Sequence, residues 1–163
     1  MLELIFLGHI EMKVFHKILS YKTTKFCHFI DITEDVEDVI KGSKIINGTA
    51  LVFTHHTTAA IRINEKEKGI EKDFEKFAKK LVPEKTYYHH NDLTERTENL
   101  VCDKDASDCL NGHSHVLHLL MGATSETVSV IEGKMIMGTF QRIFLIELDL
   151  ARKRKVKVSV MGE

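Results

Sequence analysis

Residues 51–65 read LVFTHHTTAAIRINE, and this stretch predicts two strands that meet at a polar turn. The apolar run Ala50–Phe53 consists of residues that favour a buried strand. After the turn, apolar and polar residues alternate, which places Ile61 and Ile63 on one face of the second strand. Two histidines and two threonines fill the turn at residues 55–58. Turns of this composition are more often solvated than functional, so other segments must decide what this one does.

Three helices are predicted outside this stretch. The first follows Thr33, a residue type that caps helix N-termini, and Gly42 closes it. The clearest is Gly69–Val82, and the third runs from about Gly112 to Met121. Residues 91–108 are polar with little periodicity and predict a loop. The second helix has apolar residues at three- and four-residue spacing, which predicts one buried face made of Ile70, Phe74, Phe77, Ala78 and Leu81.

Alternating or apolar runs predict the remaining strands. We expect them over Val14–Ser20, Lys25–Ile32, Thr127–Ile131, around Met135, Gln141–Leu148 and Lys155–Met161. Strands grouped around two or three helices indicate an α+β fold with a largely antiparallel sheet. A chain of 163 residues without repeats or low-complexity linkers fits a single domain, residues 1–163.

Composition and charge exclude several classes of partner. Apolar residues make up 43% of the chain and charged residues 29%, as in soluble globular proteins. The net charge of −1 leaves no excess of Lys and Arg to neutralise phosphates, so we expect no nucleic-acid partner. We therefore interpret the basic run Arg152–Lys155 as a solvated strand edge. Many Lys and Glu with a single Gln form a composition associated with growth at high temperature.

Cysteines and the N-terminal segment bear on localisation. Cys27, Cys102 and Cys109 are an odd number in no standard zinc spacing, which indicates free thiols and a reducing cytoplasm. The apolar run Leu2–Leu7 is too short to cross a bilayer and lacks a basic flank. We therefore expect a cytoplasmic protein with no membrane partner. Either Met12 is the biological start, or residues 1–11 contain a genuine extra strand.

Polar blocks recur along the chain in a fixed order. They are His56-Thr57-Thr58-Ala59-Ala60, Asn64-Glu65, Asp73, Pro83, Tyr88 with His90, His115 with Gly122, Gly133, Gly138-Thr139 with Gln141, and Glu147. In this order, from about Met12 onward, the chain resembles the YjbQ family of small proteins, members of which are assigned a secondary thiamine-phosphate synthase activity. The sequence departs from the family pattern at Phe140, usually Trp, and at Asp149-Leu150-Ala151-Arg152, usually Asp-Gly-Pro-Arg.

The resemblance implies a small mixed-sheet barrel or sandwich with helices outside, assembled as a homotrimer. His56, His90 and His115 occupy family-matching positions at the ends of regular elements. Three imidazoles from separate segments commonly hold Zn²⁺ with one position open, and zinc is the divalent metal we expect here. The open alternative is that the three bind an anion or polarise a substrate without metal. His118, near a helix C-terminus, is interpreted as an ordinary surface histidine.

Acids, amides and hydroxyls complete the predicted site. Glu65 or Asp73 would orient a histidine or act as a general base, and Gln141 would fix a substrate or a water. By periodicity alone, Asp73 is a half-buried surface acid. Glu147 is left out, because six residues at ~3.3 Å each place it about 20 Å from Gln141 along one strand. The predicted substrate-binding residues are Thr57, Thr58, Arg62 and Asn64.

Three functions remain open at this point. A thiamine-phosphate synthase would join a pyrimidine pyrophosphate to a thiazole phosphate, with Arg62 and Arg142 near the phosphates. Such chemistry usually uses Mg²⁺, which prefers oxygen ligands to histidines, and the chain has no glycine-rich phosphate loop. A zinc-dependent hydrolase or lyase would act on a small phosphorylated metabolite through a metal-bound water. A trimer that binds a metal or metabolite without turnover is the third.

Overall fold

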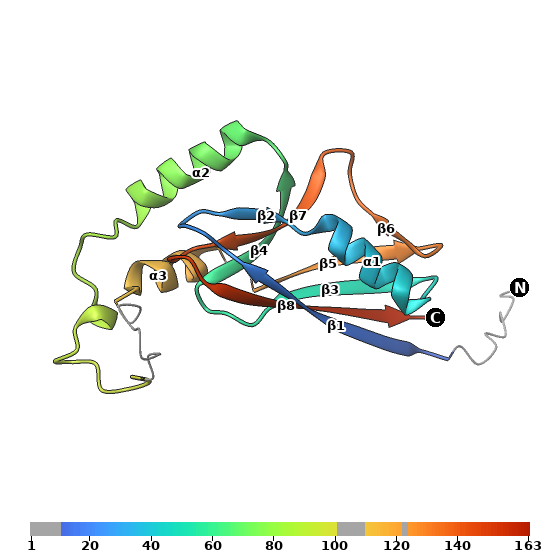
Figure 1. Cartoon of the computed structure of the whole chain (residues 1–163), viewed down its shortest axis with the longest axis horizontal. Helices are drawn as coiled ribbons and strands as arrows, with labels where there is room; N and C mark the ends of the chain where they lie inside the picture. The colour runs from blue at the N-terminus through green and yellow to red at the C-terminus, as the bar shows by residue number, and fades with distance from the viewer. Residues whose placement is uncertain (1–10, 101–109, 122–123) are drawn as a thin grey trace, which may run out of the picture.

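The computed structural model describes residues 11–100, 110–121 and 124–163 (Figure 1). The described residues form an α+β fold with eight strands, three α-helices and one short 3₁₀ helix. The strands are β1 (Lys13–Lys22), β2 (Phe29–Asp31), β3 (Gly48–Thr54), β4 (Ala59–Glu65), β5 (Ser125–Ile131), β6 (Lys134–Ile136), β7 (Gln141–Glu147) and β8 (Lys153–Gly162). The helices are α1 (Thr33–Ser43), α2 (Lys68–Leu81), η1 (His89–Asn91) and α3 (Gly112–Met121).

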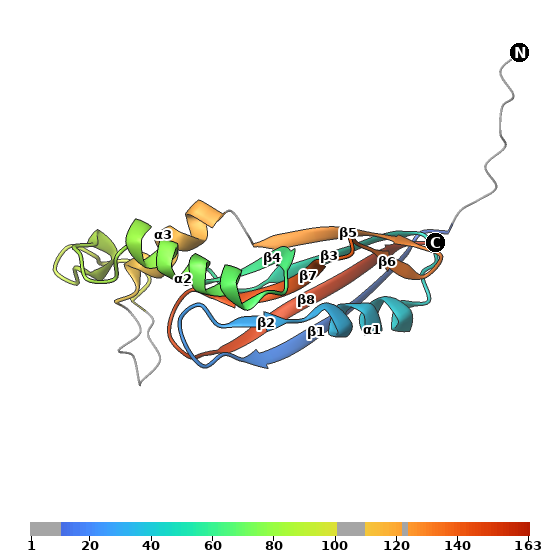
Figure 2. The ribbon, with the colours of Figure 1, turned by 90° about the horizontal axis from the view of Figure 1, so that it is seen from above.

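The strands pair into two antiparallel sheets. The larger has the order β1-β8-β3-β5-β6 and the smaller the order β2-β7-β4. Helices α2 and α3 lie at one end of the molecule and α1 at the other, as the two views of Figures 1 and 2 show. The described strands do not close into a barrel. The expected α+β class is therefore confirmed, as an open arrangement of two sheets.

Strand β7 divides the hydrophobic core into two clusters. Ile143 and Leu145 point into the main cluster, which both sheets and α1 enclose. Phe144 and Ile146 point into a second cluster, which contains residues of α2 and α3. A strand buried on both faces shows a continuous apolar run in place of alternation. This is why residues 143–146 read IFLI without interruption.

Helix α1 includes Thr33, the residue that was expected to precede it as the N-cap. The Asp31 carboxylate accepts hydrogen bonds from the Thr33 backbone N–H at 3.1 Å and from its hydroxyl at 2.7 Å. The Thr33 hydroxyl oxygen in turn accepts from the Ile143 N–H at 2.9 Å. Thr33 therefore connects the helix to β7 and does not cap its own helix.

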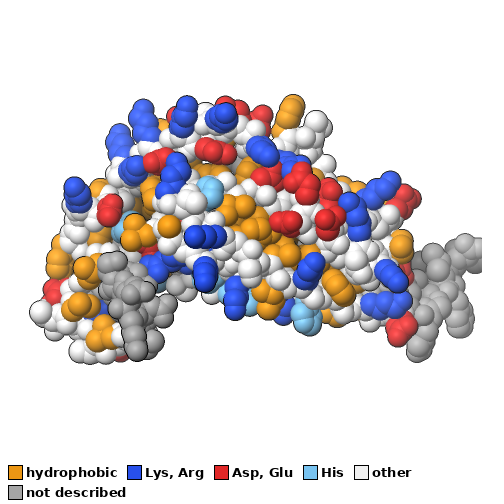
Figure 3. Space-filling view, in the orientation of Figure 1, with side chains coloured by type: hydrophobic (Ala, Val, Ile, Leu, Met, Phe, Trp, Pro, Cys, Tyr) orange, Lys and Arg blue, Asp and Glu red, His pale blue; other side chains and the backbone are white. Residues whose placement is uncertain are grey.

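The expected buried face of α2 is buried only in part. The helix begins after Glu67, whose carboxylate accepts hydrogen bonds from the N–H groups of Gly69 and Ile70 at 2.6 and 2.8 Å. Ala78 is buried, but Ile70, Phe77 and Leu81 are 39%, 64% and 71% exposed, so the expectation for these three residues was wrong. Lysine side chains stand along the outer edge of the helix (Figure 3). Helix α2 therefore has an uncovered apolar strip, formed by Phe77 and Leu81.

Two further expectations need correction. The predicted strand Lys25–Ile32 shrinks to β2, because Cys27 adopts a left-handed backbone conformation with φ of 54°. The basic run Arg152–Lys155 is not a solvated edge, since β8 lies between β1 and β3 and Arg154 is only 3% exposed. Cys27 is a buried free thiol, and burial raises its pKa to about 12.

Some expectations concern residues that the structure does not describe. The N-terminal residues 1–10, with the possible extra strand, lie outside the described residues, as do Cys102 and Cys109. Among the helices that are described, none has the length and apolarity needed to cross a membrane.

Candidate functional site

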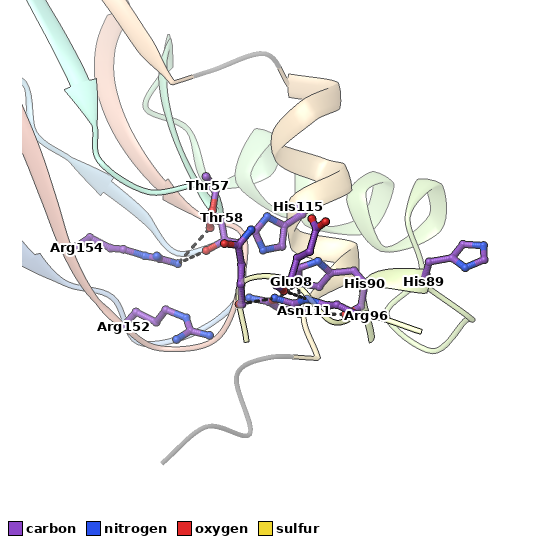
Figure 4. Close-up of a pocket in the computed structure, with 11 residues that line it drawn as sticks. Thr57, Thr58, His89, His90, Arg96, Glu98, Asn111, His115, Arg152 and Arg154 are labelled. Carbon is purple, nitrogen blue, oxygen red and sulfur yellow. Dashed lines mark hydrogen bonds between the residues drawn. The ribbon is translucent and has the colours of Figure 1, made fainter. Parts of the chain in front are cut away.

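A pocket of about 800 Å³ lies where the β3–β4 turn, the start of β8, η1 and α3 come together (Figure 4). We call it the arginine–histidine pocket. Thr57 and Thr58 come from the turn and His115 from α3; Arg152 immediately precedes β8, and Arg154 lies at its start. The rest of the lining is His89, His90, Arg96, Glu98, Asn99 and Asn111.

A buried ion pair forms one wall of the pocket. Arg154 Nε donates to Glu147 Oε2 at 2.7 Å, and Arg154 Nη2 also contacts the same carboxylate. Arg154 Nη2 donates to the Thr58 hydroxyl at 3.0 Å as well. Glu147 is fully buried and accepts a further hydrogen bond from the Thr23 hydroxyl at 2.7 Å. Buried charges are tolerated only when they are paired and hydrogen-bonded, so this network fixes the turn at Thr58 against β8.

A second acidic residue orients both Arg152 and Asn111. Arg152 Nη2 lies 2.7 Å from Asp149 Oδ2, and the Asn111 side-chain amide donates to the same oxygen at 2.8 Å. Burial raises the pKa of Asp149, but the hydrogen bonds from Asn111 and Arg152 outweigh burial and hold the pKa below its usual value. Because the Asn111 amide nitrogen is committed to Asp149, its side-chain oxygen faces His90.

His90 and His115 are the two imidazoles that face each other in this pocket, with ring centroids 4.4 Å apart. Burial, followed by the charge of Arg96, lowers the pKa of His90. Burial, followed by the neighbouring His90, lowers the pKa of His115 to about 4. Both rings are therefore neutral at pH 7, and each keeps a nitrogen lone pair that can accept a proton.

One nitrogen of His90 meets competing partners. Its Nε2 lies 3.2 Å from the Asn111 side-chain oxygen and 3.1 Å from Arg96 Nη1. It can donate to the amide oxygen or accept from the guanidinium, but a single imidazole nitrogen cannot do both at once. A ligand that engaged Arg96 would relieve this conflict.

Arg96 also holds the loop that covers this part of the pocket. Its Nη1 donates to the His90 carbonyl at 3.1 Å, its Nη2 to the Asn99 carbonyl at 3.0 Å, and its Nε to the Glu98 carbonyl at 3.3 Å. His89, in contrast, points away from the other residues that Figure 4 labels. The guanidinium of Arg96 is thus held by backbone carbonyls beside the histidine pair.

The structure separates His56 from the other two predicted metal ligands. His56 lines a neighbouring hollow together with His55 and His118. Its Nε2 accepts a hydrogen bond from the Lys155 backbone N–H at 2.8 Å. Burial, followed by the charge of Arg154, lowers its pKa. His118 contributes a buried Nε2 to the same region, so its interpretation as an ordinary surface histidine was wrong.

The remaining predicted site residues lie elsewhere. Glu65 and Gln141 are cross-strand partners at the far end of β4, and with Asn64 they line a third hollow beside Phe140. Ala59, at the near end, pairs with Glu147, so about 20 Å of strand separates the two ends. Arg62 Nη1 pairs with Glu126 at 2.8 Å, and Asp73 is exposed on α2. Of the predicted residues, Thr57, Thr58, His90 and His115 line the arginine–histidine pocket.

Comparison with known proteins identifies the family. The sequence model of the UPF0047 protein YjbQ-like family matches residues 17–163. This chain belongs to the UPF0047 family. The resemblance deduced from the order of the polar blocks is thereby confirmed.

UPF0047 relatives match nearly the whole chain. A UPF0047 protein of Methanothermobacter thermautotrophicus is 38% identical over 152 residues, which cover 93% of this chain and 95% of the relative. The UPF0047 protein YugU of Bacillus subtilis is 33% identical over 147 residues, covering 90% of this chain and 98% of YugU.

Solved structures share the UPF0047 fold. A YbjQ-like protein of unknown function from Sulfolobus solfataricus P2 has a TM-score of 0.78 and 32% identity, covering 94% of this chain and all of that one. An uncharacterised UPF0047 protein from Clostridium acetobutylicum has a TM-score of 0.73 and 32% identity, covering 88% of this chain and 98% of that one. These comparisons establish the fold and the family of this chain.

The residues in the arginine–histidine pocket fit an anion better than a zinc ion. Among the described residues, no three His, Cys, Asp or Glu side chains are placed to hold a metal. His90 and His115 supply two imidazoles, but Arg96 Nη1 lies 3.1 Å from His90 Nε2, and its positive charge would repel a cation bound there. Zinc binding by the three predicted histidines remains a prediction that this arrangement does not favour.

Sequence reasoning missed the arginines and the amide of the site: Arg96, Arg152, Arg154 and Asn111. One signal was available, because Arg154 falls in the same period of two as Val156, Val158 and Val160, the buried residues of β8. That phase predicts an inward-facing guanidinium. Arg96 carries no such signal, since it lies in a polar loop without periodicity.

Proposed function

We propose that this UPF0047 protein binds a small phosphorylated metabolite and that the phosphate occupies the arginine–histidine pocket. The supporting observation is the combination of three arginines with two neutral histidines in one pocket. The guanidinium group offers planar, directional N–H donors that match phosphate oxygens. Within the described chain, Arg154 Nη1 makes no hydrogen bond, so donors beyond those of the buried network remain for a ligand.

The positions of these arginines support binding to a defined group. Glu147 and Asp149 hold Arg154 and Arg152, and backbone carbonyls hold Arg96. A ligand therefore meets side chains that are already ordered, which lowers the entropic cost of association. The carboxylates also balance most of the positive charge, so recognition depends on hydrogen-bond geometry more than on net charge.

The proposed chemistry is acid–base catalysis next to the phosphate. A neutral imidazole can take a proton from a bound substrate and return it later in the reaction. His115 is the proposed proton acceptor, and the ring of His90 lies beside it at an angle of 47°. The thiamine-phosphate synthase reaction, with two phosphorylated substrates, is the specific reaction that the family resemblance suggests testing. Binding without turnover is the simpler alternative.

A metal-dependent hydrolase or lyase is the second candidate. Its support is the neutral state of both histidines, because an imidazole binds metal only when it is unprotonated. Such a site would need a ligand beyond His90 and His115, supplied by the substrate or by another subunit. Zinc analysis of the protein purified without added metal separates this candidate from the first.

We also propose that the protein assembles as the homotrimer that the family resemblance implies. Large apolar side chains stand exposed on two helices, with Leu119 of α3 at 78% and Leu81 of α2 at 71%. Large exposed apolar patches commonly mark interaction sites. Glu65 and Gln141 lie about 20 Å along β4 from the pocket, so they can act on a ligand there only from a second copy.

Calorimetric titration tests the phosphate proposal. We expect inorganic phosphate and small phosphate monoesters to bind the wild-type protein, and R152Q and H115A to lower that affinity about tenfold, as loss of a charge-assisted hydrogen bond does. K153Q is the matched control, because Lys153 is exposed and does not line the pocket. Absence of millimolar binding by the wild type would overturn the proposal. Release of pyrophosphate from a pyrimidine pyrophosphate plus a thiazole phosphate would then assign the synthase reaction.

A further inference from the structure

Asn111 connects the two histidines of the arginine–histidine pocket. It immediately precedes α3, and its backbone carbonyl accepts from the N–H groups of Ser114 and His115 at 2.9 and 3.3 Å. Its backbone therefore belongs to the first turn of the helix that carries His115. Its side chain contacts the other histidine, with the amide oxygen 3.2 Å from His90 Nε2 (Figure 4). Asn111 is buried, so protein groups and not solvent determine how its amide points.

The charge of Asp149 fixes the direction of the Asn111 amide. Asp149 Oδ2 accepts from the Asn111 amide nitrogen at 2.8 Å and from Arg152 Nε and Nη2 at 3.0 and 2.7 Å. Rotation of the amide by half a turn would place its oxygen against this carboxylate, and both groups would then be acceptors. The amide oxygen is therefore held towards His90. It can accept from His90 Nε2 only when that nitrogen carries the ring proton.

Arg96 favours the opposite tautomer of His90. Its Nη1 lies 3.1 Å from the same His90 Nε2, and a guanidinium can only donate. A hydrogen bond with an ionised donor is roughly twice as strong as a neutral one. In the free protein we therefore expect His90 Nε2 to accept from Arg96, with the ring proton on Nδ1. Asn111 then faces His90 without receiving a hydrogen bond from that ring.

We propose that phosphate binding transfers the ring proton of His90 from Nδ1 to Nε2, and that Asn111 is the positioning residue that holds it there. This inference rests on the proposed function. A phosphate oxygen is negatively charged and competes with a neutral imidazole for the Arg96 donor. Once Arg96 Nη1 engages phosphate, His90 Nε2 donates to Asn111. Solvent water takes the proton from Nδ1 and returns one to Nε2, so the charge of the ring does not change.

The transfer makes His90 able to accept a proton only when phosphate is bound. In the free protein the one unprotonated nitrogen of the ring is engaged by Arg96. With phosphate bound, Nδ1 is unprotonated, and a proton from the substrate or from His115 can enter the ring there. A protonated His90 still donates from Nε2 to Asn111, so the amide supports both charge states of the ring. Phosphate is thus the trigger for acid–base chemistry at the histidine pair.

Nuclear magnetic resonance of the ¹⁵N-labelled full chain reports which imidazole nitrogen carries the proton. Spectra are compared with and without saturating inorganic phosphate at pH 8, where the rings are neutral because burial lowers the pKa values of His90 and His115. H90Q identifies the His90 signals. We expect the proton on Nδ1 in the free wild type and on Nε2 with phosphate. The signals of His16, which is exposed on β1 and does not line the pocket, should not change.

Two variants assign the roles of the neighbouring side chains. N111L keeps the shape of the side chain without its acceptor, so it should prevent the transfer to Nε2 at phosphate concentrations that saturate the variant. R96L removes the competing donor, so the proton of its His90 should reside on Nε2 without phosphate. Should N111L fold poorly, the spectrum of free R96L decides, and a proton on Nδ1 there would overturn the inference.

Calorimetric titration with inorganic phosphate separates this inference from the function on which it rests. If phosphate binds and the tautomer of His90 does not change, or changes equally in N111L, the inference is wrong and the phosphate proposal stands. A free wild type with the proton already on Nε2 would show that Arg96 does not control the ring, and the inference is again wrong. Absence of phosphate binding overturns both proposals.

Discussion

The imidazole rings of His90 and His115 lie with centroids 4.4 Å apart at an angle of 47°, although one belongs to η1 and the other to α3. At this separation, protonation of one ring disfavours protonation of the other, so the two titrate as a unit. The pair is therefore the feature of the pocket whose properties respond most directly to pH.

Acid should destabilise the protein through His115. Its pKa is about 4 in the folded chain, against an ordinary value of 6.5, so the unfolded state binds the proton more readily. The contribution of neutral His115 to the free energy of unfolding is complete above pH 6.5 and is lost as the pH falls towards 4. After allowance for solvent screening, we expect a loss on the order of 1 kcal/mol between pH 7 and pH 5.

Urea unfolding in phosphate-free buffer across this range measures the loss. H115Q, whose side chain does not titrate, should flatten the pH dependence. H16Q removes an exposed histidine of β1 and serves as the control, with the wild-type slope retained. Identical slopes for H115Q and the wild type would contradict the low pKa of His115.

His90 and His115 should act together on phosphate binding, and His56 should act independently. The first two share one pocket, whereas His56 lines the adjoining hollow. In a double-mutant cycle with inorganic phosphate, we expect the alanine variants at 90 and 115 to deviate from additivity by more than about 0.5 kcal/mol. The cycle between 56 and 115 should be additive within that value. Strong coupling of all three would favour a shared metal.

The buried pair Arg154–Glu147 should be costly to break and much less costly to replace. Both side chains are almost fully buried, so removal of one leaves an uncompensated charge. We expect R154M to lower the free energy of unfolding by about 3–5 kcal/mol, and E147L/R154M to recover most of that loss.

The partly exposed pair Arg62–Glu126 is the contrast, and R62M should cost no more than about 1 kcal/mol. Urea unfolding, or soluble yield if R154M fails to fold, gives the comparison. A single R154M that unfolds like the wild type would show that the pair contributes nothing to the pocket wall.

Some parts of the molecule could be predicted from the sequence and others could not. The strands around Ile61 and the helix Gly112–Met121 follow from local patterns, and the structure places them as expected. The position of His56 depends on its contact with the Lys155 backbone, a partner far away in the chain that no local pattern specifies. Arg96 is held by carbonyls of its own loop, at His90, Glu98 and Asn99, and that loop carries no periodic pattern from which its geometry could be predicted.

Helix α2 differs from these cases. Its sequence correctly predicts an amphipathic helix, but the prediction that its whole apolar face is buried was wrong. Periodicity shows that Phe77 and Leu81 form an apolar face with Ala78, but it does not say which molecule covers that face. In the single chain these two residues remain mostly exposed.

Self-association should depend on this strip. We expect sedimentation velocity at micromolar concentration to show a trimer for the wild type and smaller species for F77K/L81K, because buried lysines would be unpaired at the interface. K76E, on the same helix with an exposed lysine replaced, should leave assembly unchanged. A monomeric wild type would remove the homotrimer from consideration.

The network around Glu147 constrains which residues of the proposed phosphate site can be changed without loss of stability. One carboxylate receives hydrogen bonds from the Thr23 hydroxyl, the Asp149 N–H and the Arg154 guanidinium, so the wall of the pocket is also part of the folded interior. A substitution there changes stability before it changes specificity. The rim residues Thr57 and Glu98 are exposed, and their side chains make no hydrogen bond within the described structure. Changes in the specificity of the proposed phosphate site are therefore expected from substitutions at the rim, where they cost little stability.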